Sequence, residues 1–373
     1  MSSVPVMNVT DLMRAMPARE ASDLHLVPGH PPCYRIHGRL HGAGDQPLAA
    51  ETVREMIRSV LPEPIRERLN HCKNVDCSVS LTSAGLSRQA GTRTSENGDP
   101  SLRFRVNVFF AREQMCACLR FIPNDIPDFE WMGFPRPLAE RIVNLTNGLV
   151  IITGITGSGK TTTLAALVNL LNREHGARII TVEEPIEYLF PSAEGSLVTQ
   201  REVGIDVDSF YDGLRSGLRQ DPNVILVGEI RDRETAQMAI SAAETGHLIL
   251  TTMHTQDAKG AITRLVDLFP SQLQSDVRSQ LSLSLRYVIA QHLLTSAEDA
   301  EKRALALEVL VVTHGIGSLI RQGRAEAIDS AIQTGRRAGM VTLDDSLAAL
   351  MTAGKISPAT ARHFAKDPES LNF

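Results

Sequence analysis

The segment Gly154-Ile155-Thr156-Gly157-Ser158-Gly159-Lys160-Thr161 has the residue types and spacing that bind a phosphate chain. Its glycines let backbone N–H groups turn toward an anion, and a helix that begins at Lys160 adds the positive end of its dipole. We expect Lys160 to reach the β- and γ-phosphates and Thr161 to offer its hydroxyl to Mg²⁺. The apolar run Leu149-Val150-Ile151-Ile152 precedes the segment, as a strand precedes a P-loop. The pattern predicts an ATP site formed by Gly154, Thr156, Gly157, Ser158, Gly159, Lys160, Thr161 and Thr162.

Acidic residues end two further segments that have strand character. Glu183 ends the run that begins at Arg178, and Glu229 follows the apolar run Asn223–Val227. In open α/β sheets, ligands bind at the carboxyl ends of the parallel strands, so we expect both acids to lie near the P-loop. Metal-assisted phosphoanhydride hydrolysis needs at least one carboxylate near the metal and one near the attacking water. The two acids therefore favour ATP hydrolysis over binding alone.

Strand-like and helix-like segments alternate in the region that positions these residues. We predict strands at Gly148–Thr153, Arg178–Val182, Asn223–Val227 and His247–Met253, and helices at Lys160–Asn172 and Glu234–Glu244. Apolar, β-branched runs that alternate with helices indicate a largely parallel sheet with helical crossovers. From Gln272 onward we predict helices.

The first part of the chain is typical of a smaller α+β domain. We predict helices at Asn8–Met16 and Thr52–Leu61, strands at Asp23–Val27, Tyr34–His37 and Arg103–Phe110, a turn at Pro28–Pro32 and a mobile hairpin loop at Gly85–Pro100. Prolines between residues 124 and 139 mark a linker. The fold class is therefore α/β, with an N-terminal domain at 1–123, a linker at 124–139 and an ATPase domain with a helical C-terminal region at 140–373.

Length and composition limit the possible classes of protein. The 373 residues are too many for one ordinary hydrophobic core, which favours two domains. The formal net charge of -5 argues against direct nucleic-acid binding. No apolar run is long enough to insert into a membrane, and the N-terminus lacks a signal-peptide pattern, so we expect a cytoplasmic protein. The 5 cysteines form no CxxC pair, which argues against a zinc site.

Taken together, the motifs resemble those of the secretion-type (GspE-like) hexameric ATPases, and among them the PilT-like type IV pilus retraction motors. The resemblance rests on the Walker A segment Gly154–Thr163, the acidic box Thr181–Tyr188, the Walker B block Leu218–Asp232 and the histidine box Thr245–Thr255. Segments near the N-terminus, including Ala21–Leu26, resemble the PAS-like domain of that family, and the core of the remainder its RecA-like domain. Ser330–Gly335 and Gly339–Asp344 resemble the C-terminal signature of the retraction motors.

The resemblance implies a role for each candidate residue. Glu183 would polarise the attacking water, and Glu229 would hold Mg²⁺ through water. His247 and His254 would sense the γ-phosphate, although a lone histidine at a strand end is more often structural. The γ-phosphate would receive positive charge from Arg103, Arg105 and Arg120, which by themselves read as surface charge on alternating strands. The family further implies a homohexamer that works at the inner-membrane pilus base with the pilus platform protein.

One helix departs from the family pattern. Retraction motors usually carry A-I-R-N-L-I-R-E where this chain has Gly315-Ile316-Gly317-Ser318-Leu319-Ile320-Arg321-Gln322. The apolar positions are kept and the polar ones are replaced, so the coupling of hydrolysis to retraction is open. This change leaves room for an ATPase of a type IVB secretion or DNA-uptake machine. An accessory retraction motor with slow turnover and a nucleic-acid motor are two further alternatives.

Overall fold

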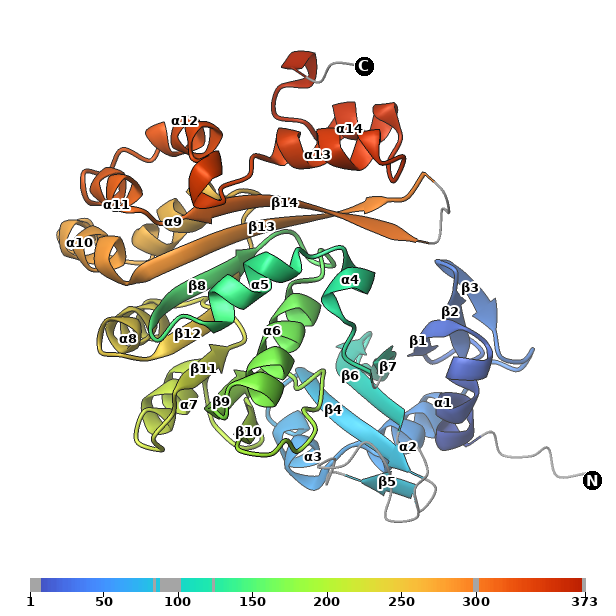
Figure 1. The fold of residues 1–373 in the computed structure, drawn as a ribbon. Coiled ribbons are helices and arrows are strands. Elements are labelled where there is room, and N and C mark those ends of the chain that lie inside the picture. Colours follow the sequence, from blue (N-terminus) through green and yellow to red (C-terminus); the bar gives the residue numbers. More distant parts are fainter. Residues whose placement is uncertain (1–7, 83–84, 88–101, 123–124, 298–301, 371–373) are drawn as a thin grey trace, which may run out of the picture. The chain divides into compact units, whose positions relative to one another are not determined.

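The computed structural model describes residues 8–82, 85–87, 102–122, 125–297 and 302–370 (Figure 1). The chain divides into two compact units. Unit 1 consists of Met1–Asp125 with two segments from later in the chain, Glu184–Pro191 and Glu202–Asp206. Unit 2 consists of Ile126–Glu183, Ser192–Arg201 and Val207–Phe373. The chain therefore passes between the units several times.

Unit 1 contains an antiparallel sheet in the order β3-β2-β1-β7-β6-β4-β5. Its strands are β1 (Ala21–Leu26), β2 (Cys33–Ile36), β3 (Arg39–Gly42), β4 (Asn74–Thr82), β5 (Gly85–Ser87), β6 (Leu102–Ala111) and β7 (Gln114–Ile122). The proline-rich segment 28–32 joins β1 to β2, as its residues predict. Of the predicted loop at 85–100, the first residues form β5, and residues 88–100 lie outside the described part of the chain.

Three helices, α1 (Val9–Ala18), α2 (Ala50–Val60) and α3 (Glu63–Leu69), belong to unit 1. Helix α2 buries Val53, Met56, Ile57 and Val60, the i, i+3, i+4, i+7 spacing that places apolar side chains on one face. This face joins one hydrophobic core with apolar residues of α1, α3 and the sheet, among them Met13, Leu24, Ile65, Phe104 and Leu119. The core gives unit 1 a hydrophobic interior of its own.

Unit 2 is built on a sheet in the order β10-β9-β11-β12-β8-β13-β14. Its strands are β8 (Gly148–Thr153), β9 (Arg178–Glu183), β10 (Leu197–Glu202), β11 (Val224–Val227), β12 (Leu248–Met253), β13 (Leu285–Thr295) and β14 (Arg303–Val311). Strands β9, β11, β12, β8 and β13 pair in parallel, and β14 pairs antiparallel with β13. The predicted α/β class with a largely parallel sheet is confirmed.

The helices of unit 2 and the C-terminal region complete the fold (Figure 1). They are α4 (Phe129–Met132), α5 (Arg136–Val143), α6 (Lys160–Glu174), α7 (Phe210–Gly217), α8 (Arg233–Glu244), α9 (Ala258–Asp267), α10 (Gln274–Ser284), α11 (His314–Arg321), α12 (Ala327–Thr334), α13 (Leu343–Thr352) and α14 (Pro358–Phe364), with 3-10 turns at Arg336–Ala338 and Pro368–Ser370. Helices α13 and α14 pack on β13 and β14 through a small apolar cluster. Among the described residues, no helix combines the length and apolar character needed to cross a membrane.

The prediction of helices alone after Gln272 is wrong, because β13 and β14 lie in that region. Strand β13 adds to the sheet beside β8, with Val288 opposite Ile151. Strand β14 in turn pairs with β13 along its length. Non-local pairing decides this structure, and the local pattern around Leu285–Thr295 does not distinguish a buried strand from a buried helix.

Close packing of α7 on β9 leads to a prediction about Gly213. A Cβ atom at Gly213 would lie 2.6 Å from Cγ1 and 2.9 Å from Cγ2 of Val182, whereas a Cβ atom at Gly217 would lie 3.6 Å from its nearest neighbour, Ile180. We expect Gly213→Ala to lower the free energy of unfolding by about 1–3 kcal/mol, because overpacking strains the core. Gly217→Ala, in the same helix, is the matched control and should be neutral or stabilising by about 0.5–1 kcal/mol.

Chemical denaturation would measure both variants. Adding Val182→Ala to Gly213→Ala should recover part of the loss, because the companion change removes the methyl groups that clash. Equal stability of the two glycine variants would contradict the packing that the structure shows.

Candidate active site

The P-loop joins strand β8, which is buried at every residue, to helix α6. Gly154 has φ +148°, and a Cβ atom there would meet the Ser158 hydroxyl and lie 2.5 Å from the carbonyl oxygen of Gln291. No side chain fits at this position. Gly159, with φ +88°, precedes the first residue of α6. The loop therefore turns tightly before the helix, and the amino end of α6 faces the concave side of the P-loop.

Lys160 lies inside this turn and is 8% exposed. Its Nζ donates hydrogen bonds to the carbonyl oxygens of Gly154 (2.9 Å) and Ile155 (3.0 Å). Burial lowers the pKa of Lys160, and the negative charge of Glu229 counteracts this effect. The interaction places Lys160 and Glu229 in one electrostatic environment.

The side chains around the loop fit a bound phosphate chain. The Ser158 hydroxyl is buried and has no hydrogen-bond partner among the described residues, and Ser158 is 1% exposed. Buried polar atoms are rarely left unsatisfied, so an unpaired hydroxyl in an anion-binding loop indicates a missing polar ligand. Thr161 and Thr162, at the start of α6, reach the surface.

Parallel pairing brings the ends of four strands to one edge of the sheet. Met253 of β12 pairs with Thr153 of β8 at the P-loop, and Val227 of β11 pairs with Thr251 and with Val182 of β9. Glu183, Glu229 and His254 thus follow or end strands at the same edge as the P-loop. At the usual spacing of about 4.8 Å, three strand steps put the end of β9 about 14 Å from that of β8.

Glu229 lies in an ion-pair cluster at this edge. Its Oε2 is 3.2 Å from Nε2 of His254, and its Oε1 pairs with the guanidinium of Arg231. The Glu229 side chain is 13% exposed, whereas those of His254 and Arg231 are largely exposed. The structure therefore brings together three of the predicted residues, Lys160, Glu229 and His254.

Glu183 ends β9 and is 7% exposed. Its Oε1 accepts hydrogen bonds from the hydroxyl of Thr181 (2.6 Å) and from Nε2 of Gln200 (3.1 Å). Thr181 lies two residues earlier on β9, and Gln200 lies on β10. Two donors on one oxygen restrict the rotation of the carboxylate.

His247 lies apart from these residues within its own unit. It precedes Leu248, which pairs with Gly148 at the start of β8, and the P-loop follows the other end of that strand. Six residues of strand span roughly 20 Å. The Nδ1 atom of His247 lies 3.2 Å from the carbonyl oxygen of Ala242. The structure does not bring His247 to the P-loop of the same chain.

The three predicted arginines lie on β6 and β7 of unit 1, where Arg105 is paired across the strands with Arg120. Arg105 binds the carboxylates of Asp76 (2.6 Å) and Glu187 (3.3 Å). Arg120 binds Asp23 at 2.9 Å, and its side chain is 63% exposed. Arg103 is 4% exposed and donates to the carbonyl oxygen of Ile186 at 2.8 Å. Carboxylates thus hold Arg105 and Arg120 in place, and a backbone carbonyl holds Arg103.

The structure reveals residues that the motifs alone do not single out: Gln200, Arg231 and Gln291. Gln291 is fully buried on β13 and donates from Nε2 to the hydroxyl of Thr163, on α6, at 2.7 Å. The position of Gln291 inside an apolar run could have signalled this role, because a buried polar side chain is costly unless it has a hydrogen-bond partner. Gln200 carried no such signal, because its partner lies on another strand.

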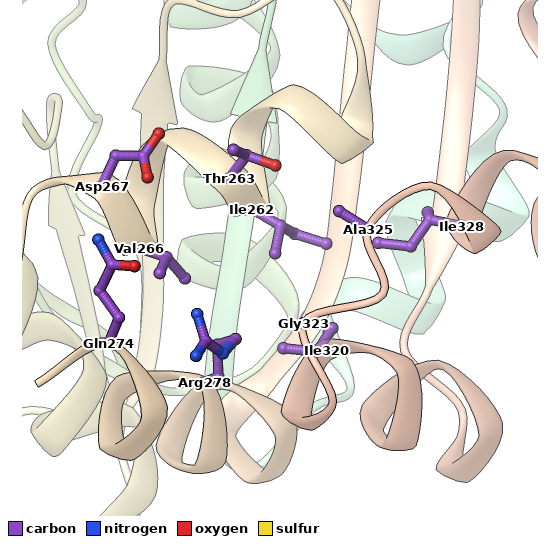
Figure 2. A pocket seen from close by; sticks show the side chains of 10 residues that line it. All are labelled: Ile262, Thr263, Val266, Asp267, Gln274, Arg278, Ile320, Gly323, Ala325 and Ile328. Carbon is purple, nitrogen blue, oxygen red and sulfur yellow. The ribbon is translucent and has the colours of Figure 1, made fainter. Parts of the chain in front are cut away.

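A separate cavity of about 110 Å³ lies among α9, α10, α11 and α12 (Figure 2). Half of its ten lining residues are aliphatic, and the guanidinium of Arg278 borders it. Its volume is below the roughly 300–1,000 Å³ of pockets that bury larger ligands. The cavity shares no residue with the P-loop and is not the nucleotide site.

A P-loop on a parallel sheet, with carboxylates at the neighbouring strand ends, defines a P-loop ATPase. The family model described as "Type II/IV secretion system protein" matches residues 91–363, so the chain belongs to that family. The resemblance inferred from the motifs is confirmed, and the chain is an ATPase that binds nucleotide.

Relatives are similar over nearly the whole chain. The type IV pilus retraction ATPase PilT of Pseudomonas aeruginosa is 39% identical over 98% of this chain and 100% of its own. A twitching motility protein of Neisseria gonorrhoeae is 37% identical over 98% of this chain and 92% of its own. The crystal structure of the pilus retraction motor PilT with bound ADP has a TM-score of 0.82 and 37% identity, and the match covers 98% of this chain and 99% of that one.

Lys160→Met tests the P-loop by separating fold stability from nucleotide binding. Because burial lowers the pKa of Lys160 in the folded state, its charge weakens the fold at pH values below the ordinary pKa of 10.5, including pH 7. The ligand-free variant should therefore unfold at the wild-type temperature or above. It should lose the stabilisation by ADP, which is about 2.7 kcal/mol at 100 times Kd.

Thermal unfolding with and without ADP would measure both effects. Lys355→Met, at an exposed lysine, is the matched control and should keep the shift caused by ADP. A normal ADP shift in Lys160→Met would contradict the assignment of the P-loop.

Proposed function

We propose that this protein is a hexameric motor that hydrolyses ATP to power the retraction of a type IV pilus. The observation that carries the proposal is the placement of Lys160, Glu229 and Glu183 at one edge of a parallel sheet. Full-length similarity to PilT supports the choice of machine. The motor would act in the cytoplasm, at the inner-membrane base of the pilus, with the platform protein as its partner. Residues 1–123 would form a PAS-like domain, and 140–373, after a linker at 124–139, a RecA-like ATPase domain.

The residues divide the chemistry of hydrolysis between them. The P-loop amides and the ammonium of Lys160 bind the phosphate oxygens, which replace the carbonyl partners that Lys160 has here. Glu183, held by Thr181 and Gln200, orients and polarises the attacking water. The terminal phosphate and that water would lie along the sheet edge between the ends of β8 and β9.

A magnesium ion fits the oxygen donors beside the P-loop. The hydroxyl of Thr161 and the carboxylate of Glu229, acting through water, would hold it, since Mg²⁺ keeps several waters and prefers oxygen ligands. When bound, Mg²⁺ would neutralise charge that develops on the phosphates. His254, paired with Glu229, would respond to the γ-phosphate.

Positive charge on the γ-phosphate would come from a neighbouring subunit of the hexamer. Arg103, Arg105 and Arg120 are the candidates, and Arg120 is the most accessible of them. An arginine supplied in trans stabilises charge in the transition state. His247, which lies far from its own P-loop, would also have to act at such an interface to sense nucleotide.

Glu183→Gln is the primary test of the proposed function. The change keeps the shape of the side chain and removes the base, so we expect kcat for ATP hydrolysis to fall by about 10²–10⁴-fold. Glu194→Gln, at an exposed carboxylate, is the control and should match the wild type. Cells with the variant should carry excess pili that do not retract. Unchanged turnover would disprove the mechanism. Lost turnover with normal pili but lost secretion or DNA uptake would assign the enzyme to another machine.

Arg120→Ala tests the supply of charge in trans. Arg35 offers a matched control, because its Nε also approaches Asp23, at 4.0 Å. We expect Arg120→Ala to lower kcat by about 10³-fold, as for other arginine fingers, and Arg35→Ala to leave it near wild type.

Mixed rings provide the second readout for Arg120. Subunits that carry Glu183→Gln keep Arg120, and subunits that carry Arg120→Ala keep Glu183. Mixing the two inactive proteins should restore part of the turnover, because some interfaces then hold both residues. No recovery in mixed rings would rule out an arginine that acts across the interface.

A further inference from the structure

Both sides of the Glu183 hydrogen bond lie next to chain connections between the two units. Glu183 is the last residue of unit 2 before the chain enters unit 1 at Glu184. Gln200 is the last residue but one before the chain enters unit 1 again at Glu202. The two residues are 17 positions apart and are joined by the 3.1 Å hydrogen bond from Nε2 of Gln200 to Oε1 of Glu183.

Within unit 1, one carboxylate joins the two segments that follow these residues. Oε2 of Glu202 accepts hydrogen bonds from the hydroxyl of Ser78 (2.6 Å) and from the backbone N–H of Ile186 (3.1 Å), and its Oε1 accepts from the backbone N–H of Ser78 (3.1 Å). Ser78 lies on β4, which pairs with β6 on one side and with the edge strand β5 on the other. Glu202 is 3% exposed. We call Glu202, Ser78 and Ile186 the Glu202 clip.

Burying the Glu202 carboxylate costs desolvation free energy, which its hydrogen bonds must offset. Burial raises the pKa of Glu202, and the donors from Ser78 and Ile186 counteract it. A buried carboxylate persists where several donors satisfy it. Ile186 lies three residues after Glu183, and Glu202 lies two residues after Gln200. The clip therefore holds the segment that follows Glu183 and the segment that follows Gln200 on the same strand of unit 1, β4.

We propose that Gln200 is a positioning residue for Glu183, and that the Glu202 clip links the orientation of Glu183 to unit 1. The inference rests on the proposed role of Glu183 in activating water. A short connection transmits displacement, since two or three residues of extended chain span no more than about 7–11 Å. Any movement of unit 1 acts on both ends of the Glu183–Gln200 hydrogen bond at once. Hydrolysis is thereby made dependent on how unit 1 is held in the ring.

Steady-state ATP turnover of the full-length protein tests the role of Gln200. We expect Gln200→Ala to lower kcat by about 10–10²-fold with KM unchanged, because a misplaced catalytic group slows the chemical step. Gln200→Glu keeps the shape but replaces the donor with a second carboxylate, so its kcat should be at least as low. Thr199→Val is the matched control on the same strand; it removes an acceptor for Arg178 and should leave kcat near wild type.

The background of Glu183→Gln separates positioning from a structural role. A residue that acts through Glu183 loses its effect once Glu183 is replaced, so Gln200→Ala should not lower the residual rate of Glu183→Gln further. A further drop, or a joint change of kcat, KM and thermal stability, would overturn the positioning role. So would wild-type turnover of Gln200→Ala.

Ser78→Ala tests the link to unit 1 without touching unit 2. It removes one donor from the Glu202 carboxylate, and we expect kcat to fall several-fold while the affinity for ADP, measured by calorimetry, stays unchanged. Ser59→Ala, which removes a hydroxyl from α2 elsewhere in unit 1, is the control. Wild-type kcat in Ser78→Ala would overturn the link.

Wild-type turnover of Glu183→Gln would disprove the proposed catalytic role itself. A dead Glu183→Gln with a normal Gln200→Ala would disprove only the inference.

Discussion

Strands β12 and β8 pair in parallel from Leu248 with Gly148 to Met253 with Thr153, and β11 and β9 continue the same direction across the sheet. Backbone hydrogen bonds set this register, and a shift of one residue would turn each side chain to the other face. Because the strands are parallel, the P-loop and the residues after the neighbouring strands must meet at one edge. The placement of Lys160 beside Glu229, and of Glu183 further along that edge, follows from the pairing. The same constraint sends His247 to the opposite edge.

At that edge, the site contains a charged group whose burial costs free energy. The ammonium of Lys160 is withdrawn from water and satisfied by carbonyl groups of its own loop. Gly154 permits the loop to approach Gln291 of β13, a strand more than 130 residues later in the chain. Buried polar groups without bulk water interact strongly, so each acts on its neighbours more than it would at the surface. In the proposed function, a bound phosphate chain would replace these carbonyl partners with phosphate oxygens.

The two units are not separate stretches of sequence. Glu184–Pro191 and Glu202–Asp206 leave the ATPase unit and join unit 1, where Arg103, Arg105 and Ser78 hold them. The carboxylate expected to activate water thus lies at the beginning of the first excursion. A motor must relate chemistry at the sheet edge to movement of whole domains, and covalent connections this short are a direct way to do so.

The sequence alone determined the P-loop, the acids at the ends of two strands and the alternation that predicts a parallel sheet, because these depend on local spacing and on strand periodicity. It identified the family for the same reason, since the motifs are contiguous. It did not determine β13 and β14, whose strand structure depends on pairing with β8, nor the partnership of Gln200 with Glu183, which joins residues 17 positions apart. Only the tertiary structure decided that Glu202 binds Ser78, a residue 124 positions away, and that His247 lies at the far edge from the P-loop. Such contacts depend on which segments the folded chain brings together, and a local sequence pattern carries no information about residues so far apart in the chain.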